Sequence, residues 1–169
     1  MTKALLVIDV QNYFINKHTK HLPKIISAFI KRNKNNFDYI LFTKFINNRK
    51  SNFVKILKWN KCFKSPEIDI HKDILEFTNK NNVFVKAMFS PFKSKKFISF
   101  MKKNRINELY VCGTDTEACV YATAIDAFDM GYKIKILKNL CGSHHGKKQH
   151  KIGCRLIEEN LERKKYVRR

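Results

Sequence analysis

The segment from Glu108 to Asp129 constrains the fold of this chain more than any other. It begins with a short apolar run, Leu109 to Cys112, whose length and composition are typical of a buried strand. The run breaks at Gly113, and apolar residues then recur at three- and four-residue spacings, which predicts a helix that begins at or near Cys119. A strand followed by a sharp turn and a helix is the repeating unit of an open α/β sheet. Such sheets bind ligands at the carboxyl ends of their strands.

Cys119 falls in the first turn of this predicted helix. Free N–H groups and the positive end of the helix dipole favour a thiolate there, so the position alone predicts a lowered pKa for the thiol. The arrangement follows the logic of a nucleophile elbow, although the chain has no G-x-S-x-G sequence. A small, buried core residue is the alternative interpretation of the same cysteine.

The rest of the chain alternates between buried strands and amphipathic helices. Strands are predicted at 4–10, 39–43, 83–85, 109–112 and 133–137, and helices at 22–31, 97–104, 117–129 and 152–161. This alternation implies right-handed crossovers and a mainly parallel sheet with helices on both faces. Charged and apolar residues alternate in the last strand, which places it near an edge of the sheet. The length of 169 residues and the absence of repeats indicate one domain, residues 1–169.

The segments between these elements have weaker patterns. Residues 44–73 are expected to form an excursion over the surface, with a short helix around 53–59, and to contribute to a pocket wall. A helical turn is expected at 74–77 and a loop at 139–145. The basic tail, residues 163–169, is expected to be solvated.

Composition limits the partners of the chain. It has 35 Lys and Arg against 14 Asp and Glu, which gives a formal net charge of +21. Such a charge favours anionic partners, but no run of five basic residues occurs, so nucleic acid is expected only as a non-specific partner. Five cysteines without a C-x-x-C pair argue against a disulfide framework or a zinc site and favour a cytoplasmic protein. No apolar run approaches the roughly 20 residues that span a bilayer, so no membrane partner is expected.

Three reactive side chains lie at the ends of predicted strands. Asp9 lies near the end of the first strand, Lys86 follows 83–85, and Cys119 follows the turn after 109–112. Because the carboxyl ends of parallel strands meet at one edge of a sheet, we expect these side chains to lie together. The lysine would stabilise a thiolate, and the carboxylate would act as a general base toward the thiol. A loop cap or an internal salt bridge is the alternative role for Asp9.

Three segments resemble the signature blocks of the isochorismatase-like cysteine hydrolases, a superfamily that includes nicotinamidases and N-carbamoylsarcosine amidase. The segments read L-L-V-I-D-V-Q-N-Y-F (5–14), V-F-V-K-A-M-F-S-P-F (83–92) and V-C-G-T-D-T-E-A-C-V-Y-A-T-A-I-D-A-F-D-M-G-Y (111–132). They occur in the family's order and spacing, and the resemblance extends from residue 4 to about 160. It implies a Rossmann-like, three-layer α/β/α sandwich with a mainly parallel sheet of about five to six strands.

The resemblance also implies roles for individual residues. Asp9 would be the acid/base, Lys86 its electrostatic partner and Cys119 the nucleophile. An oxyanion hole would use the backbone N–H groups of Asp115 and Cys119, with a cis peptide bond between Thr114 and Asp115. The implied reaction is attack of Cys119 on a small amide, carbamoyl or related acyl substrate, followed by hydrolysis of a thioester. Candidate pocket walls, each equally compatible with an ordinary core position, are Phe14, Phe89, Phe92 and Tyr121.

Two departures from the family narrow the substrate. Nicotinamidases carry an Asp-x-His metal cluster after the second strand, but residues 43–49 read T-K-F-I-N-N-R. We therefore expect no metal and no other cofactor, and nicotinamide becomes a less favoured substrate. True isochorismatases lack the nucleophilic cysteine, which argues against isochorismate. The resemblance also implies a homo-oligomer, a dimer or larger. His144 and His145 are expected on a loop near the site, and His150 is expected to make a structural hydrogen bond.

Two other interpretations stay open. In the first, the chain is a weak or inactive family member that binds nucleic acid or another polyanion through its basic surface. In the second, it is a structural oligomer with vestigial chemistry. An unreactive Cys119 would favour either of them over the hydrolase.

Overall fold

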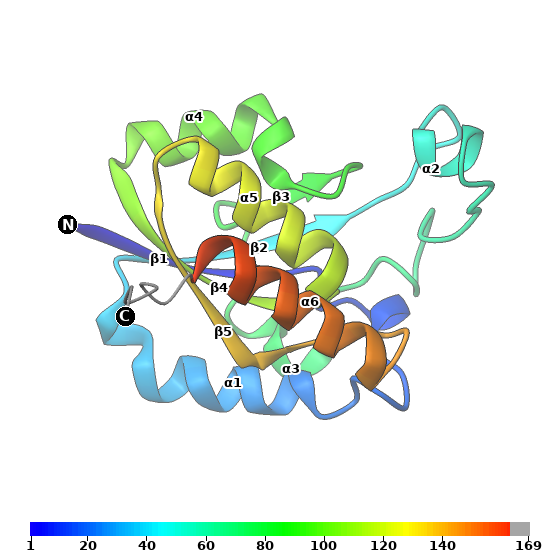
Figure 1. The fold of residues 1–169 in the computed structure, drawn as a ribbon, viewed down its shortest axis with the longest axis horizontal. Coiled ribbons are helices and arrows are strands. Elements are labelled where there is room, and N and C mark those ends of the chain that lie inside the picture. Colours follow the sequence, from blue (N-terminus) through cyan, green and yellow to red (C-terminus); the bar gives the residue numbers. More distant parts are fainter. Residues whose placement is uncertain (163–169) are drawn as a thin grey trace, which may run out of the picture.

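The computed structural model describes residues 1–162, which are built on one five-stranded parallel sheet (Figure 1). The strands are β1 (Thr2–Ile8), β2 (Tyr39–Phe45), β3 (Val83–Lys86), β4 (Ile106–Thr114) and β5 (Lys133–Gly142). Their order is β3-β2-β1-β4-β5, and each neighbouring pair is parallel. The predicted parallel α/β fold is confirmed, with β5 at an edge. The basic tail lies outside the described residues.

Helices cover both faces of the sheet. They are α1 (Leu22–Asn33), α2 (Asn52–Lys55), α3 (Lys72–Leu75), α4 (Lys95–Lys103), α5 (Tyr121–Asp129) and α6 (Lys147–Leu161), with 3₁₀ turns at Asn12–Phe14, Lys34–Asn36 and Pro91–Lys93. Figure 1 shows α1 and α3 on one side of the sheet and α4 and α5 on the other. Helix α6 packs against α5 and the turn at 116–120. None of the helices within residues 1–162 is long and apolar enough to cross a membrane.

The core forms because the central strands are apolar on both faces. Leu5, Leu6 and Ile8 of β1 are completely buried, as expected for a parallel strand between two helical layers. Helix α1 buries Leu22, Ile26 and Ile30, which recur every four residues and therefore share one helix face. A second, smaller apolar cluster lies outside this core and is centred on Phe14, Phe45 and Cys62.

The topology defines where a ligand is expected to bind. From β1 the chain moves through β2 to β3 on one side, whereas β4 and β5 lie on the other side of β1. The carboxyl ends of β1 and β4 therefore border the point where the strand order reverses. Open α/β sheets bind their ligands in the crevice at this point.

Three local predictions need correction. Strand β5 continues to Gly142, through residues predicted as loop, because its end pairs with Gly113 and Thr114 of β4 after a register shift. The helix after β4 begins with a π turn, Thr116–Val120, and becomes regular only at Tyr121. The short helix predicted around 53–59 is helical only over Asn52–Lys55. These differences depend on contacts between segments, which local periodicity does not contain.

Candidate active site

Asp9 directly follows β1 and is held by the ends of two neighbouring strands. It is completely buried, and its backbone has a φ of 46°, a left-handed conformation that non-glycine residues seldom adopt. The Asp9 amide donates to Thr43 Oγ1 at 3.0 Å, and the same hydroxyl donates to Asp9 Oδ1 at 2.6 Å. The Thr114 hydroxyl donates to the Asp9 carbonyl at 2.8 Å. These bonds fix the direction of the carboxylate.

Lys86, the last residue of β3, reaches the same point from the other side. Its Nζ lies 2.6 Å from Asp9 Oδ2, and both side chains are completely buried. The ammonium also donates to the Met88 carbonyl at 3.0 Å and to Cys119 Sγ at 3.5 Å. Burial lowers the pKa of Lys86, but the charge of Asp9 and the hydrogen bonds to Asp9 and Cys119 raise it, and the net shift is upward. Lys86 is therefore an ammonium ion that pairs with Asp9 and contacts the thiol.

Cys119 lies in the turn after β4 and is only 8% exposed. The predicted lowering of its pKa is wrong. Burial, the largest effect, raises the pKa of the thiol, Lys86 lowers it, Asp9 raises it again, and the net shift is well upward. The physical reason is that desolvation of the sulfur and the neighbouring carboxylate both disfavour a thiolate. Cys119 is thus a protonated thiol beside a carboxylate.

The turn that carries Cys119 is tight. Gly113 has a φ of 116°, and a Cβ at this position would lie 2.1 Å from the Ile8 carbonyl oxygen, so only glycine fits. The peptide bond between Thr114 and Asp115 is cis.

The amides on either side of Cys119 share one acceptor. The carbonyl of Asp115 accepts hydrogen bonds from the amides of Ala118 and Val120, each at 3.1 Å.

A cavity of about 350 Å³ opens in front of Cys119. Its lining residues are Phe14, Phe45, Phe53, Leu57, Trp59, Phe89, Asp115, Ala118, Cys119, His144 and His145. A larger hollow of about 580 Å³, called the outer hollow below, is lined by residues of α2 and shares Phe53, Leu57 and Phe89 with this cavity. Cys119 lines the smaller cavity but not the outer hollow, so the smaller cavity is the one beside the thiol.

Two of the four aromatic residues predicted as pocket walls, Phe14 and Phe89, line the cavity. Phe92 does not, because it is buried and packs against the rings of Phe97 and Tyr132. Tyr121 does not either, since it lies two residues beyond Cys119, which on a helix places it on a different face.

Sequence reasoning missed the aromatic residues that the excursion contributes to the cavity. Phe53 and Trp59 form this wall, and the Trp59 ring nitrogen donates to the Tyr13 hydroxyl at 3.2 Å. Their number gave no signal, because the aromatic content of residues 44–73 is close to the 12% of the whole chain.

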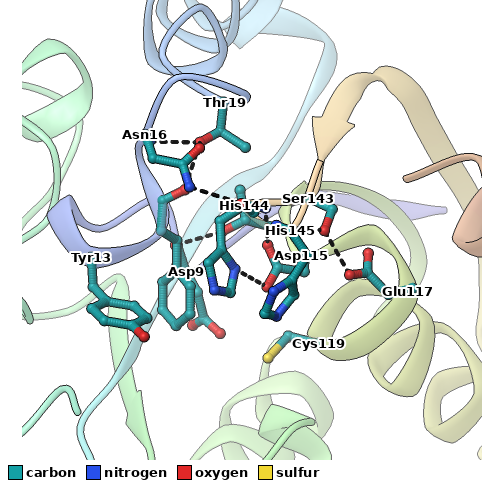
Figure 2. Close-up of polar contacts among 12 residues, drawn as sticks. Asp9, Tyr13, Asn16, Thr19, Asp115, Glu117, Cys119, Ser143, His144 and His145 are labelled. Atoms are coloured by element: carbon teal, nitrogen blue, oxygen red, sulfur yellow. Dashed lines mark hydrogen bonds and ion pairs between the residues drawn. The ribbon is translucent and has the colours of Figure 1, made fainter. Parts of the chain in front are cut away.

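His144 and His145, in the loop after β5, both line the cavity. His144 Nδ1 is 2.5 Å from Asp115 Oδ2, and the His144 amide donates to Asp115 Oδ1 at 2.9 Å. Figure 2 shows Asp115, His144 and His145 close together near Cys119. His150 lies away from the cavity, where its Nδ1 is 2.7 Å from the Thr116 hydroxyl.

Comparison with known proteins gives matches along the whole described chain. The family model of the isochorismatase domain matches residues 3–162. An uncharacterized isochorismatase family protein of Bacillus subtilis (strain 168), YddQ, is 27% identical over 153 residues, which cover 85% of this chain and 79% of that protein.

Solved structures share the fold. The pyrazinamidase/nicotinamidase of Streptococcus mutans UA159 superposes with a TM-score of 0.80 at 23% identity, over 95% of this chain and 98% of that one. The N-carbamoylsarcosine amidase of Thermoplasma acidophilum superposes with a TM-score of 0.75 at 17% identity, over 92% of each chain.

Proposed function

The chain belongs to the isochorismatase domain family of hydrolases, and from that premise we propose that it is a cysteine hydrolase with Cys119 as nucleophile, Asp9 as acid/base and Lys86 as their electrostatic partner. One observation carries the proposal: Lys86 Nζ lies 2.6 Å from Asp9 Oδ2 and 3.5 Å from Cys119 Sγ. A thiol on a cavity wall, beside a carboxylate that is paired with an ammonium, supplies the nucleophile and the proton acceptor that acyl transfer needs.

In the proposed reaction, Asp9 removes the thiol proton while Cys119 Sγ bonds to the carbonyl carbon of an amide or carbamoyl group. The raised pKa of Cys119 fits proton transfer during attack better than a stored thiolate. The C–N bond then breaks, and Asp9 returns the proton to the nitrogen, which leaves as ammonia or an amine. Water, deprotonated by Asp9, attacks the thioester carbonyl carbon, the C–S bond breaks, and the sulfur recovers a proton. No cofactor is needed for these steps.

The negative charge on the carbonyl oxygen needs hydrogen-bond donors during both attacks. We assign this role to the backbone N–H groups of Asp115 and Cys119, which belong to the tight turn beside the sulfur. The hydrogen bonds from Ala118 and Val120 to the Asp115 carbonyl support the assignment, because they hold this turn rigidly around Cys119. A preorganised donor of this kind is worth about 3 kcal/mol of transition-state stabilisation.

The cavity supports a small substrate. Its volume of about 350 Å³ lies at the lower end of the range for small-molecule sites. Five of its lining residues are Phe or Trp, so the acyl group should be compact and largely apolar, with polar atoms near the Cys119 end.

The direct test is trapping of the acyl-enzyme. The protein would be incubated with a panel of small primary amides and carbamoyl compounds, with ammonia release followed and the tryptic peptides weighed after acid quench. We expect ammonia release and an acyl mass increment on the Cys119 peptide. Cys119→Ala should lose both, whereas the control Cys154→Ala, which changes a partly exposed cysteine of α6, should retain both. Ammonia release that survives Cys119→Ala would contradict the proposal.

The basic surface of α6 supports a second candidate function. Lys147, Lys148, Lys151 and Arg155 line one shallow hollow on this helix, and we propose that it associates non-specifically with nucleic acid or another polyanion. The logarithm of the affinity should fall linearly with the logarithm of salt concentration, because each neutralised phosphate releases counterions. Binding by Lys147→Glu/Lys151→Glu equal to that of wild type would contradict this second proposal. Homo-oligomerisation stays a prediction that light scattering can check.

A further inference from the structure

A second polar cluster lies on the cavity wall, apart from the Asp9–Lys86 pair. Asp115, His144 and His145 each present one potential ligand atom, a carboxylate oxygen or a ring nitrogen, and these atoms all lie within 4.8 Å of one another. The side chains come from two separate turns, one after β4 and one after β5, and point toward one another in Figure 2. Convergence of three such groups from distant segments calls for an explanation.

Two of the three groups are held in place by their surroundings. Asp115 is only 5% exposed, and both of its oxygens contact His144, one through the ring and one through the amide. The His144 carbonyl accepts from Asn16 Nδ2 at 2.8 Å, and the rings of Tyr13 and Phe14 pack edge-on against the imidazole. The Asp115 and His144 side chains are therefore held beside each other at the cavity wall.

The third group is free to adjust. His145 is exposed, and its ring centroid is 3.8 Å from that of His144. Its amide donates to Ser143 Oγ at 3.1 Å, and the Ser143 hydroxyl donates to Glu117 Oε1 at 2.6 Å. The backbone of His145 is thus anchored while its ring can turn.

The local charge favours a cation in spite of the basic surface. Asp9, the other buried carboxylate near the cavity, is neutralised by Lys86. Within residues 1–162, the ion-pair partner of Asp115 is His144, and no lysine or arginine lies within ion-pair distance of this carboxylate.

We propose that Asp115, His144 and His145 bind a divalent transition-metal ion of the Zn²⁺, Co²⁺ or Ni²⁺ class. One carboxylate oxygen and two imidazole nitrogens form a ligand set that these ions accept, whereas Ca²⁺ and Mg²⁺ prefer oxygen ligands alone. Bonds of about 2.0–2.2 Å put neighbouring ligand atoms on the order of 3.3 Å apart. Metal binding would therefore replace the 2.5 Å hydrogen bond between Asp115 Oδ2 and His144 Nδ1, move these two atoms apart and turn the exposed His145 ring toward them. The remaining coordination position would face the cavity.

This site lies elsewhere in the fold than the Asp-x-His metal cluster of nicotinamidases, which follows the second strand. The expectation of no metal rests on residues 43–49, after the second strand, which lack a histidine. The proposed ligands lie instead beyond β4 and β5, and they come together only because β5 continues to Gly142 and carries the loop back over the turn at Asp115. The ligand atoms differ from the groups assigned to the proposed hydrolysis, since Asp115 would bind the metal through its carboxylate and serve that reaction through its backbone N–H, and metal binding can therefore be measured without any assay of hydrolysis.

The test is titration of the chelator-treated full chain with Co²⁺, followed by visible d–d absorption and calorimetry. Wild type should bind one equivalent. His145→Ala should bind at least tenfold more weakly, while His21→Ala, which removes an exposed histidine at the start of α1, should bind like wild type. Because His145 is exposed, its variant should fold normally, as circular dichroism would check. Asp115→Asn should also weaken binding.

Three outcomes would overturn the proposal. The first is absence of saturable binding below millimolar Co²⁺ in wild type. The second is equal affinity of His145→Ala and His21→Ala. The third is a near-ultraviolet sulfur-to-cobalt charge-transfer band in wild type, together with loss of the d–d bands in Cys119→Ser. That pair of results would mean that the Cys119 thiol binds the metal in place of the assigned ligands.

Discussion

The two sides of the cavity are built in different ways. On one side, Asp9, Lys86 and Cys119 lie at or just beyond the ends of β1, β3 and β4, and all three are buried. On the other side, the excursion supplies α2 and the residues after it, where Ile56 and Leu57 are 68% and 61% exposed. Sheet hydrogen bonds position the first side, whereas the second is held by ring contacts and by loop hydrogen bonds, such as those from Asn47 Nδ2 to the carbonyls of Trp59 and Lys61.

The ring contacts of the second side centre on Phe53. Phe53 contacts Phe45 at 5.0 Å and Trp59 at 5.6 Å between ring centroids, and it contacts Phe89 at 4.8 Å. Such a wall can change shape without disturbing the sheet, since loops tolerate substitution better than the elements they join. The comparison therefore separates chemistry from substrate choice: the strand ends should determine the reaction, and the excursion should determine what enters.

The largest difference should be in the response to loss of an ion pair. Lys86→Met would leave the Asp9 carboxylate buried and unpaired, which should lower the free energy of unfolding by about 3–5 kcal/mol. The matched change is Lys44→Met in β2, which removes a partly exposed pair with Asp69 of the excursion at 4.0 Å and should cost less than about 1 kcal/mol. Urea unfolding of both variants provides the measurement. Equal losses of unfolding free energy in the two variants would contradict the distinction between the two sides of the cavity.

A change in the excursion wall should alter substrate binding more than chemistry. Trp59→Ala would remove the ring that contacts Phe45 and the donor to the Tyr13 hydroxyl. With a substrate found in the amide panel, KM should rise about tenfold while kcat stays within about threefold, because a wall contact is made equally in the ground and transition states. If kcat falls as far as kcat/KM and KM is unchanged, then Trp59 acts in the chemical step and the separation is wrong.

The smallest effect should distinguish the two exposed large apolar residues of the excursion, Ile56 and Leu57. Leu57 lines the cavity and the outer hollow, whereas Ile56 lines the outer hollow without being part of the cavity lining. Both side chains are exposed, so either change to alanine should alter stability by no more than about 0.5 kcal/mol. Leu57→Ala should change KM by about two- to threefold, and Ile56→Ala should leave KM unchanged. Similar effects on KM would mean that the outer hollow takes part in binding.

The same contrast explains how much the sequence alone could predict. Continuous apolar runs identify the strands that precede Asp9, Lys86 and Cys119, and a parallel sheet brings strand ends together whatever the loops do. The structure accordingly places these three side chains in contact. Thr43, which bonds both the amide and the carboxylate of Asp9, was not identified, because a threonine at the end of a strand has no distinctive pattern.

Properties that depend on long-range packing escaped prediction. The pKa of Cys119 was expected to fall, since the helix start is visible in the sequence, but the burial that raises it is not. Phe92 and Phe89 are close in the chain, yet only Phe89 lines the cavity. Trp59 and Phe53 reach the cavity through contacts with Tyr13, Phe45 and Phe89 that no local periodicity encodes.

The central claim is that Asp9, Lys86 and Cys119 form one coupled unit. The most direct test is the rate of iodoacetamide labelling of the Cys119 peptide against pH, read by mass spectrometry in chelator-treated wild type, Asp9→Asn and Lys86→Met. In wild type, Cys119 should be labelled only at a pH above that at which a free thiol, with a pKa of about 8.5, is labelled. Loss of the Asp9 negative charge should move this range downward, and loss of the Lys86 positive charge should move it upward. A profile that is the same in all three proteins, or a wild-type range at or below that of a free thiol, would contradict the account.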